Sequence, residues 1–199
     1  EHSVCFKLRQ SKKINKIFGF PGNAGTRKIA QNVNINILNF KDISNFLKNN
    51  NTKIVFVGPE VPLVNGIKDY LEKKGFFIFG PSKAASRLEK SKSFTKTLCK
   101  KYKIPTANYK SFNSMKGVKE YIDKMNVPIV IKADGLASGK GVFICKNKNT
   151  ALQKCKAINQ GKFKSSKKFV IEEFLSGEEA SYFILSDGKN YKITSHLTR

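Results

Sequence analysis

The residues best suited to chemistry are concentrated in the stretch VPIVIKADGLASGKGVFICK, residues 127–146. Two apolar runs flank a loop that contains Gly135, Gly139, Lys140 and Gly141. The backbone amides of such a loop can close over phosphate oxygens while the lysine supplies positive charge. The loop does not match the P-loop pattern, because a strand and not a helix follows it. From these residues alone it is either a phosphate-binding flap or a hairpin connection whose glycines give mobility.

Two further stretches place charged residues within or beside apolar runs. Lys132 lies within the apolar run IVIKA, where an ammonium group needs an anionic partner unless it faces water on the outside of the sheet. The run VIEEFLSGEEASYFIL contains four of the chain's fourteen acidic residues. A strand that ends there can offer backbone groups to a flat base and a carboxylate to ribose hydroxyls. The alternative is a solvated acidic turn.

The first ninety residues contain two more candidate loops. PGNAGT, residues 21–26, is either an anion-binding nest or an ordinary loop of turn-forming residues. GPEVPLVNG, residues 58–66, places Glu60 at the end of an apolar strand and at the start of a helix. A carboxylate there can bind an amine or hydroxyl of a ligand, although acidic residues are also common at helix starts.

The elements around these loops follow two patterns. Before Pro81, strands predicted at 16–20, 34–38, 53–57 and 76–79 alternate with helices at 42–49 and from Pro62 onward, which indicates a parallel sheet covered on both faces. Ligands bind at the carboxyl ends of such strands. One long helix is predicted over residues 82–102. An α+β pattern follows, with strands near Tyr109 and at 128–133, 142–146 and 168–174, helices around residues 118–125 and 151–158, and a hairpin over 181–185 and 191–194.

Composition limits the possible function classes. The net charge of +24 suggests nucleic acid, but only four of the 38 basic residues are arginine and the lysines are scattered without a patch. No apolar run is long enough for a membrane helix. Four cysteines without metal-ligand spacing predict buried, reduced thiols and a cytoplasmic location. The first residues are already helical and the last follow a strand, so we expect a fragment at both ends.

In this order, PGNAGT, FVGPEVPLVNGI, FGPSKAASRLEKSKSFTK, YKIPTA, PIVIKADGLASGKGV and VIEEFLSGEEAS resemble the phosphoribosylamine-glycine ligase family of the ATP-grasp superfamily. The resemblance implies an α/β protein: an N-terminal Rossmann-like parallel-sheet domain, its first strand missing, followed by the first part of an α+β ATP-grasp domain. The implied boundaries are 1–88 and 89–199, with a connector helix at about 82–103.

The resemblance also implies an activity. An ATP-dependent ligase joins glycine to 5-phosphoribosylamine through glycyl phosphate, and the products are glycinamide ribonucleotide, ADP and phosphate, in purine biosynthesis. The cofactors are ATP and Mg²⁺ or Mn²⁺, with metal ligands expected in a missing C-terminal part, so the fragment alone is expected to be inactive. A monomer that binds small substrates, without nucleic acid or membrane, is expected. The alternatives are another ATP-grasp carboxylate-amine ligase or carboxylase and, more remotely, a basic nucleic-acid-binding module.

Site residues are assigned by the same resemblance, and His196 and Arg199 receive no role. The residues implied for ATP are Lys92, Lys132, Gly135, Ser138, Gly139, Lys140, Gly141, Glu172, Glu173, Phe174, Leu175 and Glu179. The residues implied for phosphoribosylamine are Gly22, Asn23, Gly25, Thr26, Gly58, Pro59 and Glu60.

Overall fold

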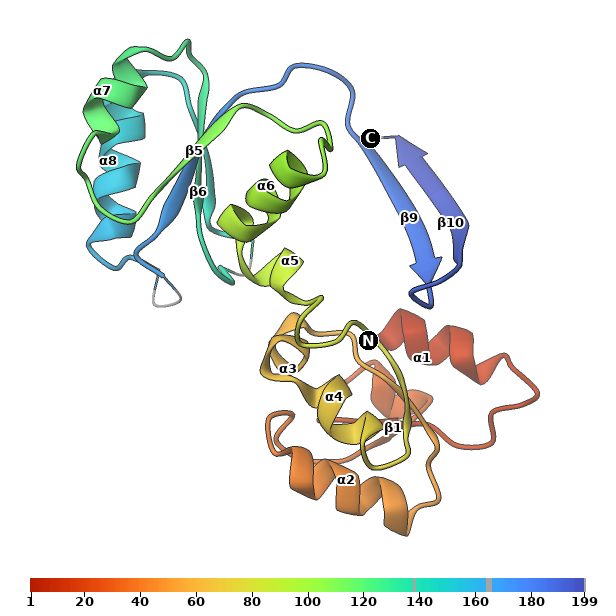
Figure 1. The fold of residues 1–199 in the computed structure, drawn as a ribbon. Helices are drawn as coiled ribbons and strands as arrows, with labels where there is room; N and C mark the ends of the chain where they lie inside the picture. The colour runs from red at the N-terminus through yellow and green to blue at the C-terminus, as the bar shows by residue number, and fades with distance from the viewer. Residues whose placement is uncertain (138, 164–165, 199) are drawn as a thin grey trace. The chain divides into compact units, whose positions relative to one another are not determined.

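The computed structural model describes residues 1–137, 139–163 and 166–198. Contacts divide the chain into two compact units, one formed by residues 1–102 with 134–136 and the other by residues 103–133 with 137–199. Each unit mixes helices and strands (Figure 1). The predicted α/β class is therefore confirmed.

The first unit contains two small parallel sheets. In one, β1 (Phe18–Gly19) pairs with β2 (Gln31–Asn32), and in the other β3 (Ile54–Phe56) pairs with β4 (Phe77–Phe79). The connecting elements are α1 (His2–Arg9), the 3-10 turn η1 (Thr26–Lys28), α2 (Phe40–Asn49), α3 (Glu60–Asn65) and α4 (Ile67–Glu72), and then α5 (Arg87–Lys90) and α6 (Lys92–Lys101) follow.

The core of this unit is formed by the apolar faces of α2, α3 and α4 against β4. Their helical spacing places one side chain per turn inward, as predicted from the sequence. One face of the β3–β4 sheet is uncovered, because Phe77 and Phe79 remain 66% and 43% exposed. The prediction of a sheet covered on both faces is wrong for this pair. The buried side chains are Ile43, Leu47, Leu63, Ile67, Leu71 and Ile78.

Three predicted elements of the first unit are also wrong. Residues 34–38 form no strand and contain a turn at 37–38, where Asn36 accepts hydrogen bonds from the backbone N–H groups of Leu38 and Asn39. The helix predicted from Pro62 is divided by Gly66, whose φ of 95° is left-handed. The single helix predicted over 82–102 is divided at Ser91, where the backbone is extended. There the Ser91 hydroxyl caps α6 by accepting from Phe94 N–H at 3.2 Å.

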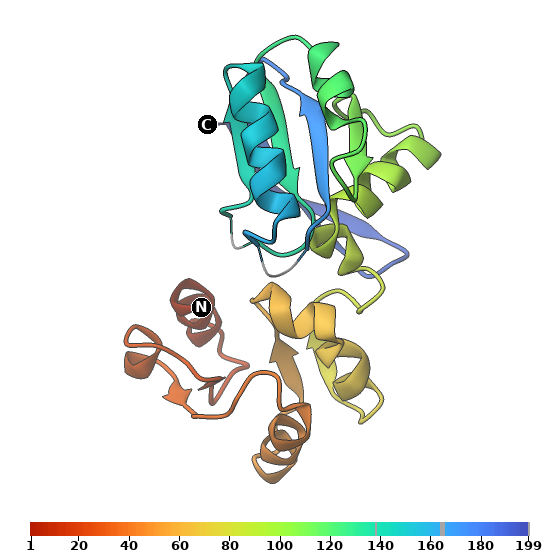
Figure 2. The same cartoon turned by 90° about the vertical axis from the view of Figure 1, so that its left-hand side faces the viewer.

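The second unit is built on a four-stranded antiparallel sheet in the order β5 (Tyr109–Phe112), β8 (Phe169–Glu173), β6 (Ile129–Ala133), β7 (Val142–Cys145). The helices α7 (Val118–Asp123) and α8 (Lys148–Asn159) lie on one face of this sheet (Figure 2). Alternate strand residues point to that face and form the core with the helices. The core side chains are Phe112, Val118, Ile122, Ile129, Ile131, Ala133, Cys145, Ala151, Cys155, Ile158, Phe169 and Ile171.

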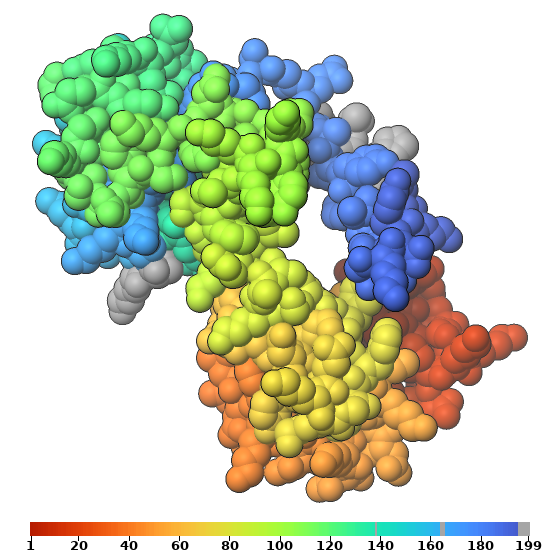
Figure 3. Space-filling view, viewed as in Figure 1, coloured from red at the N-terminus to blue at the C-terminus, as the bar shows by residue number. Residues whose placement is uncertain are grey.

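A hairpin of β9 (Ala180–Ser186) and β10 (Tyr191–Thr198) follows β8 along the chain. The side chains of residues 182–194 are exposed, and this part of the hairpin is blue in the space-filling view (Figure 3). Tyr182, Ile184 and Tyr191 are 62%, 55% and 72% exposed. The predicted α+β pattern of this half is confirmed.

The four cysteines are free thiols, but only two are in the core. Cys145 and Cys155 are buried, as predicted, whereas Cys5 and Cys99 are half-buried. Their helices expose one face to water, so an apolar stripe in the sequence did not suffice to bury them. No helix among the described residues is long and apolar enough to cross a membrane.

Candidate functional site

Lys132 and Glu172 form an ion pair on the sheet face opposite α7 and α8. The Nζ atom of Lys132 lies 2.9 Å from Oε2 of Glu172 on the adjacent strand. Glu172 is 3% exposed and the Lys132 side chain 30% exposed. The lysine therefore has an anionic partner within the chain and is not simply an outward-facing lysine on a wet surface. Both residues were predicted to bind ATP, and the structure brings them together.

An apolar strip that the sequence analysis missed runs beside this pair. Val142 and Ile144 on β7 lie opposite Lys132 and Val130 in the antiparallel register, and directly opposed residues share a face. Val142 is 48% and Ile144 60% exposed. An uncovered apolar strip next to an ammonium group can contact a flat base while the cation meets a phosphate. The alternation in the run VFIC was the available signal, since its alternate side chains must lie on opposite faces.

The glycine-rich loop connects β6 to β7, which are antiparallel neighbours. Ala133 N–H donates to the Gly141 carbonyl at 2.8 Å, and Lys140 N–H donates to the Ala137 carbonyl at 2.9 Å. Gly141 is buried, and a Cβ atom there would lie 2.6 Å from the Ala137 Cβ. The side chain of Lys140 is exposed. The loop thus joins two strands, as predicted, while Ser138 lies outside the described residues.

Lys92 and Gly135 are in direct contact within the first unit. Lys92 is the first residue of α6, and its Nζ donates to the Gly135 carbonyl at 2.8 Å. Gly135 has a left-handed φ of 96°, which glycine adopts without strain. The structure therefore brings together two residues that were implied for ATP from positions 43 apart in the sequence.

The acidic run divides into a structural part and an exposed part. Glu173 accepts hydrogen bonds from Asn108 N–H at 2.8 Å and from Asn108 Nδ2 at 3.1 Å. Its own N–H donates to the Asn108 carbonyl at 3.0 Å. Burial, and then the nearby charge of Glu173, raise the pKa of Tyr121. The carboxylate of Glu173 thus braces the end of β8 against the chain entering β5.

The residues that follow β8 are more open. Phe174 is 41% and Leu175 63% exposed, and Glu179, just before β9, is exposed as well. An uncovered chain segment directly after a strand has backbone groups that a ligand can reach. The reading of this run as an entirely solvated acidic turn is wrong, because Glu172 is buried and Glu173 half-buried.

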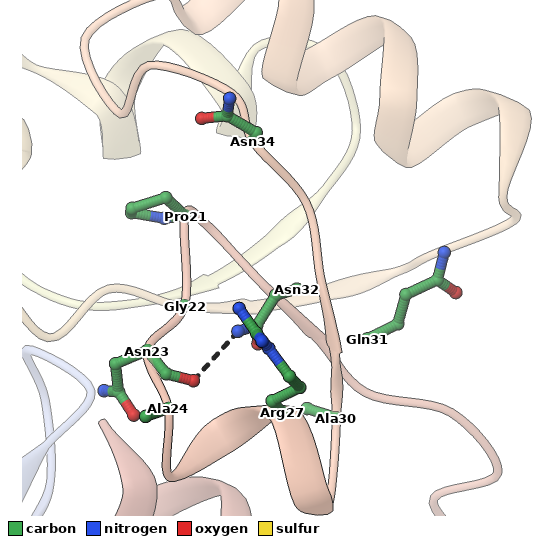
Figure 4. A pocket seen from close by; sticks show the side chains of 9 residues that line it. All are labelled: Pro21, Gly22, Asn23, Ala24, Arg27, Ala30, Gln31, Asn32 and Asn34. Carbon is green, nitrogen blue, oxygen red and sulfur yellow. Dashed lines mark hydrogen bonds between the residues drawn. The ribbon is translucent and has the colours of Figure 1, made fainter.

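The PGNAGT loop forms one wall of an open cavity of about 570 Å³ (Figure 4). Thr26 is 1% exposed, and its hydroxyl lies 2.8 Å from Asn32 Oδ1. The Asn32 amide in turn donates to the Asn23 carbonyl at 2.9 Å. The cavity is lined by Pro21, Gly22, Asn23, Ala24, Arg27, Ala30, Gln31, Asn32 and Asn34.

Within this loop, Asn23 and Thr26 shape the backbone. Asn23 Oδ1 accepts from Thr26 N–H at 3.0 Å, and Asn23 Nδ2 donates to Glu1 at 3.0 Å. Gly22 is left-handed, with φ 79°, and a Cβ atom there would lie 2.2 Å from Asn32 Oδ1. Arg27 lines the cavity and was not predicted, although it directly follows the motif. Its guanidinium group gives the cavity a positive charge that can bind an anionic ligand.

Glu60 begins α3 directly after Gly58 and Pro59. Its carboxylate is exposed and makes no hydrogen bond or ion pair with any other residue that the structure describes. The position is the one predicted, at the carboxyl end of β3 and the start of a helix. The backbone there is ordinary, since Pro59 is extended with φ −78° and ψ 145°.

The described residues do not offer a protein-bound metal site. Within residues 1–137, 139–163 and 166–198, no three His, Cys, Asp or Glu residues group in a way that could bind a metal ion. A Mg²⁺ site built from protein side chains alone is therefore not supported by this part of the chain.

Comparisons with known proteins agree with this geometry. Residues 1–89 match the family model for the N domain of phosphoribosylglycinamide synthetase, and residues 90–197 match that for its ATP-grasp (A) domain. A phosphoribosylamine-glycine ligase of Mesorhizobium japonicum is 44% identical over 189 residues, which cover 94% of this chain and 44% of that protein. The chain thus spans less than half the length of this curated relative.

Two solved structures show the same fold. The crystal structure of a phosphoribosylamine-glycine ligase from Thermotoga maritima matches with a TM-score of 0.74 and 29% identity, over 96% of this chain and 46% of that one. The biotin carboxylase domain of Hydrogenobacter thermophilus 2-oxoglutarate carboxylase matches with a TM-score of 0.77 but 17% identity, over 98% and 47%. Fold similarity alone therefore does not separate these enzymes, whereas sequence does.

The two units and the loop between β6 and β7 define an ATP-grasp protein. More specifically, the chain belongs to the phosphoribosylglycinamide synthetase family, which both family models and the curated phosphoribosylamine-glycine ligases show.

Proposed function

We propose that the full-length protein is an ATP-dependent ligase that joins glycine to 5-phosphoribosylamine. Membership in the family supports this reaction, and the observation that carries it is the contact of Lys92 with Gly135 beside the glycine-rich loop. An ammonium group at such a loop is suited to phosphate oxygens. The domain boundaries at 1–88 and 89–199 and a cytoplasmic location remain predictions.

The proposed chemistry has two steps. A carboxylate oxygen of glycine attacks the γ-phosphorus of ATP, the bond to the bridging oxygen breaks, and ADP leaves. The amine of phosphoribosylamine then attacks the carbonyl carbon of glycyl phosphate, loses a proton and expels phosphate. Positioning and charge neutralisation supply most of the acceleration in such transfers. Mg²⁺ or Mn²⁺ would enter with ATP and neutralise the phosphate charge.

The residues near the loop are assigned to ATP. Lys92 and Lys132 would neutralise phosphate charge, and the loop with Gly139, Lys140 and Gly141 would cover the phosphates. Val142 and Ile144 would contact the base, because they are exposed on the face that contains Lys132. The backbone of residues 173–175 would meet the edge of the base, and Glu179 would accept from the ribose hydroxyls.

The cavity beside PGNAGT is assigned to phosphoribosylamine. Gly22 and Gly25 let the backbone approach a ligand closely, while Asn23 and Thr26 maintain the loop. Arg27 would bind the 5-phosphate, since a guanidinium group matches phosphate geometry. Glu60, with Gly58 and Pro59, would accept from the amine or a hydroxyl.

ADP formation by the full-length protein tests this proposal. We expect sustained ADP formation only when glycine and phosphoribosylamine are both present, because glycyl phosphate is consumed only by the amine, and much less ADP when β-alanine replaces glycine as a control. ADP formation that needs neither substrate would contradict the proposal. The rival nucleic-acid role predicts duplex DNA binding that weakens steeply between 50 and 200 mM salt, roughly 10³-fold or more for six or more phosphate contacts.

A further inference from the structure

Asp134 is a buried carboxylate that the proposed chemistry does not use. It is 6% exposed and lies between β6 and Gly135. Residues 134–136 group with residues 1–102 and not with the strand that precedes them. A carboxylate at such depth requires several donors, because burial without partners strongly disfavours its charge.

The donors to Asp134 come from the start of α6. The Ser93 hydroxyl donates to Oδ2 at 2.7 Å and the Ser91 hydroxyl to Oδ2 at 3.1 Å. Ser93 N–H donates to Oδ1 at 3.3 Å. A negative charge next to the first turn of a helix is also favoured by the helix dipole. Asp134 thus binds the residues on both sides of Lys92.

Lys92 itself also contacts this segment. Its Nζ donates to the carbonyl of Gly135, the residue after Asp134. Lysine is a flexible four-carbon chain with a point charge, so its position depends on how firmly its backbone is anchored. Two neighbouring loop residues therefore anchor the backbone and the ammonium group of one lysine. Lys132 and Glu172 take part in neither of these contacts.

We infer that Asp134 is a positioning residue for Lys92, which it places at the start of the glycine-rich loop where nucleotide phosphates bind. The inference deepens the proposed function and rests on its assignment of Lys92 to ATP. Bound phosphates would replace the Gly135 carbonyl as the acceptor of the Lys92 ammonium group. The Asp134 contacts would persist and keep the backbone of Lys92 in place.

A double-mutant cycle on the full-length protein tests the inference. The affinity for AMP-PNP, a non-hydrolysable ATP analogue, is measured by calorimetry for Asp134→Ala in the wild-type and Lys92→Ala backgrounds. We expect about tenfold weaker binding in the wild-type background and less than about twofold weaker binding when Lys92 is absent, since coupled residues are non-additive. An equal loss in both backgrounds, or no loss, would overturn the inference.

Two features keep the test decisive. If Asp134→Ala does not fold, as judged by circular dichroism, Ser93→Ala replaces it in the same cycle, because it removes the 2.7 Å donor and leaves the other two. We expect about threefold weaker binding, again only when Lys92 is present. AMP-PNP binding requires neither glycine nor phosphoribosylamine. A coupled cycle without ligation would thus contradict the proposed reaction alone, and ligation with an additive cycle would contradict the positioning role alone.

Discussion

The ammonium group of Lys132 lies 2.9 Å from the buried carboxylate of Glu172, on a neighbouring strand of the same sheet. The lysine therefore has a structural role in the fold, and the proposed function assigns it in addition to the nucleotide phosphates. Removal of one partner of a fully buried pair destabilises a protein by about 3–5 kcal/mol. The value for Lys132 should be smaller, because its side chain is 30% exposed.

Lys132→Met separates the structural role of Lys132 from its proposed role in ATP binding. We expect a loss of about 2 kcal/mol in the free energy of unfolding, measured with urea, and a lower affinity for ATP. The double variant Lys132→Met with Glu172→Gln should regain most of the stability, because it removes the buried charge, but should not regain the affinity. Lys119→Met is the matched control, since Lys119 and its partner Asp123 are both exposed and the free energy of unfolding should change much less. Recovery of ATP affinity in the double variant would contradict a direct role for Lys132.

Gly22→Ala should damage the cavity of the PGNAGT loop specifically. The new Cβ atom would lie 2.2 Å from Asn32 Oδ1, and Asn32 is fixed by its hydrogen bonds to Asn23 and Thr26. We expect the KM for phosphoribosylamine to rise at least about tenfold while the KM for ATP changes little, because a clash of this kind moves the loop by an ångström or more.

Gly117→Ala is the control for backbone strain. Its φ of 73° is close to the 79° of Gly22, but no atom lies within 4 Å of its Cβ position. It should therefore lower stability by about 1 kcal/mol without changing the ratio of the two KM values. Equal effects of the two variants on that ratio would show that the cavity is not the binding site.

The sequence predicted the second unit better than the first. Strands were predicted at 128–133 and 168–174, and the structure has β6 and β8 there, with Ile131 and Ile171 in the core and the Lys132–Glu172 ion pair on the opposite face. The breaks at Gly66 and Ser91 were missed because the apolar helical periodicity continues across them. A hydrogen bond from a serine to an aspartate 43 positions away is a tertiary feature that no local pattern indicates.

The site residues likewise divide into those that the sequence predicted and those that it did not. Motifs identified Lys92 and Gly135, but their contact depends on how the chain returns after 43 residues. Val142, Ile144 and Arg27 were missed because their surroundings depend on tertiary packing. The sequence does not indicate that Val142 and Ile144 are exposed or that Arg27 lines a cavity. Glu173 was assigned to the nucleotide, and its side chain has in addition a structural role toward Asn108 that requires the sheet register.

The turn between β9 and β10 should respond to acid. Backbone N–H groups of Asn190 and Lys189 donate to Asp187 and lower its pKa from 3.8 to about 2. Because the folded pKa is below the ordinary value, the carboxylate stabilises the turn above about pH 4, and this contribution is lost as the pH falls toward 2. The chemical shift of the Asn190 amide should change with pH with a midpoint near 2 in the unmodified protein. This change should be absent in Asp187→Asn. A midpoint near 3.8 would show that these hydrogen bonds do not form in solution.

The four cysteines should differ in reactivity. Burial raises the pKa of Cys155 to about 12 and also raises that of Cys145, so both remain protonated thiols at pH 8. The thiolate is the reactive form. Mass spectrometry after brief alkylation at pH 8 should find Cys5 and Cys99 labelled and the two core cysteines unlabelled, whereas all four should be labelled in denaturant. Early labelling of Cys155 would contradict its place in the core.

The transfer of oxygen from glycine to phosphate tests the central claim most directly. Glycine labelled with ¹⁸O in its carboxylate is supplied with ATP and phosphoribosylamine to the full-length protein, and the released phosphate is analysed by mass spectrometry. If glycyl phosphate forms, each phosphate should contain one ¹⁸O atom, because the amine displaces the oxygen that attacked the γ-phosphorus. Phosphate without ¹⁸O, at normal ADP yield, would contradict the proposed reaction.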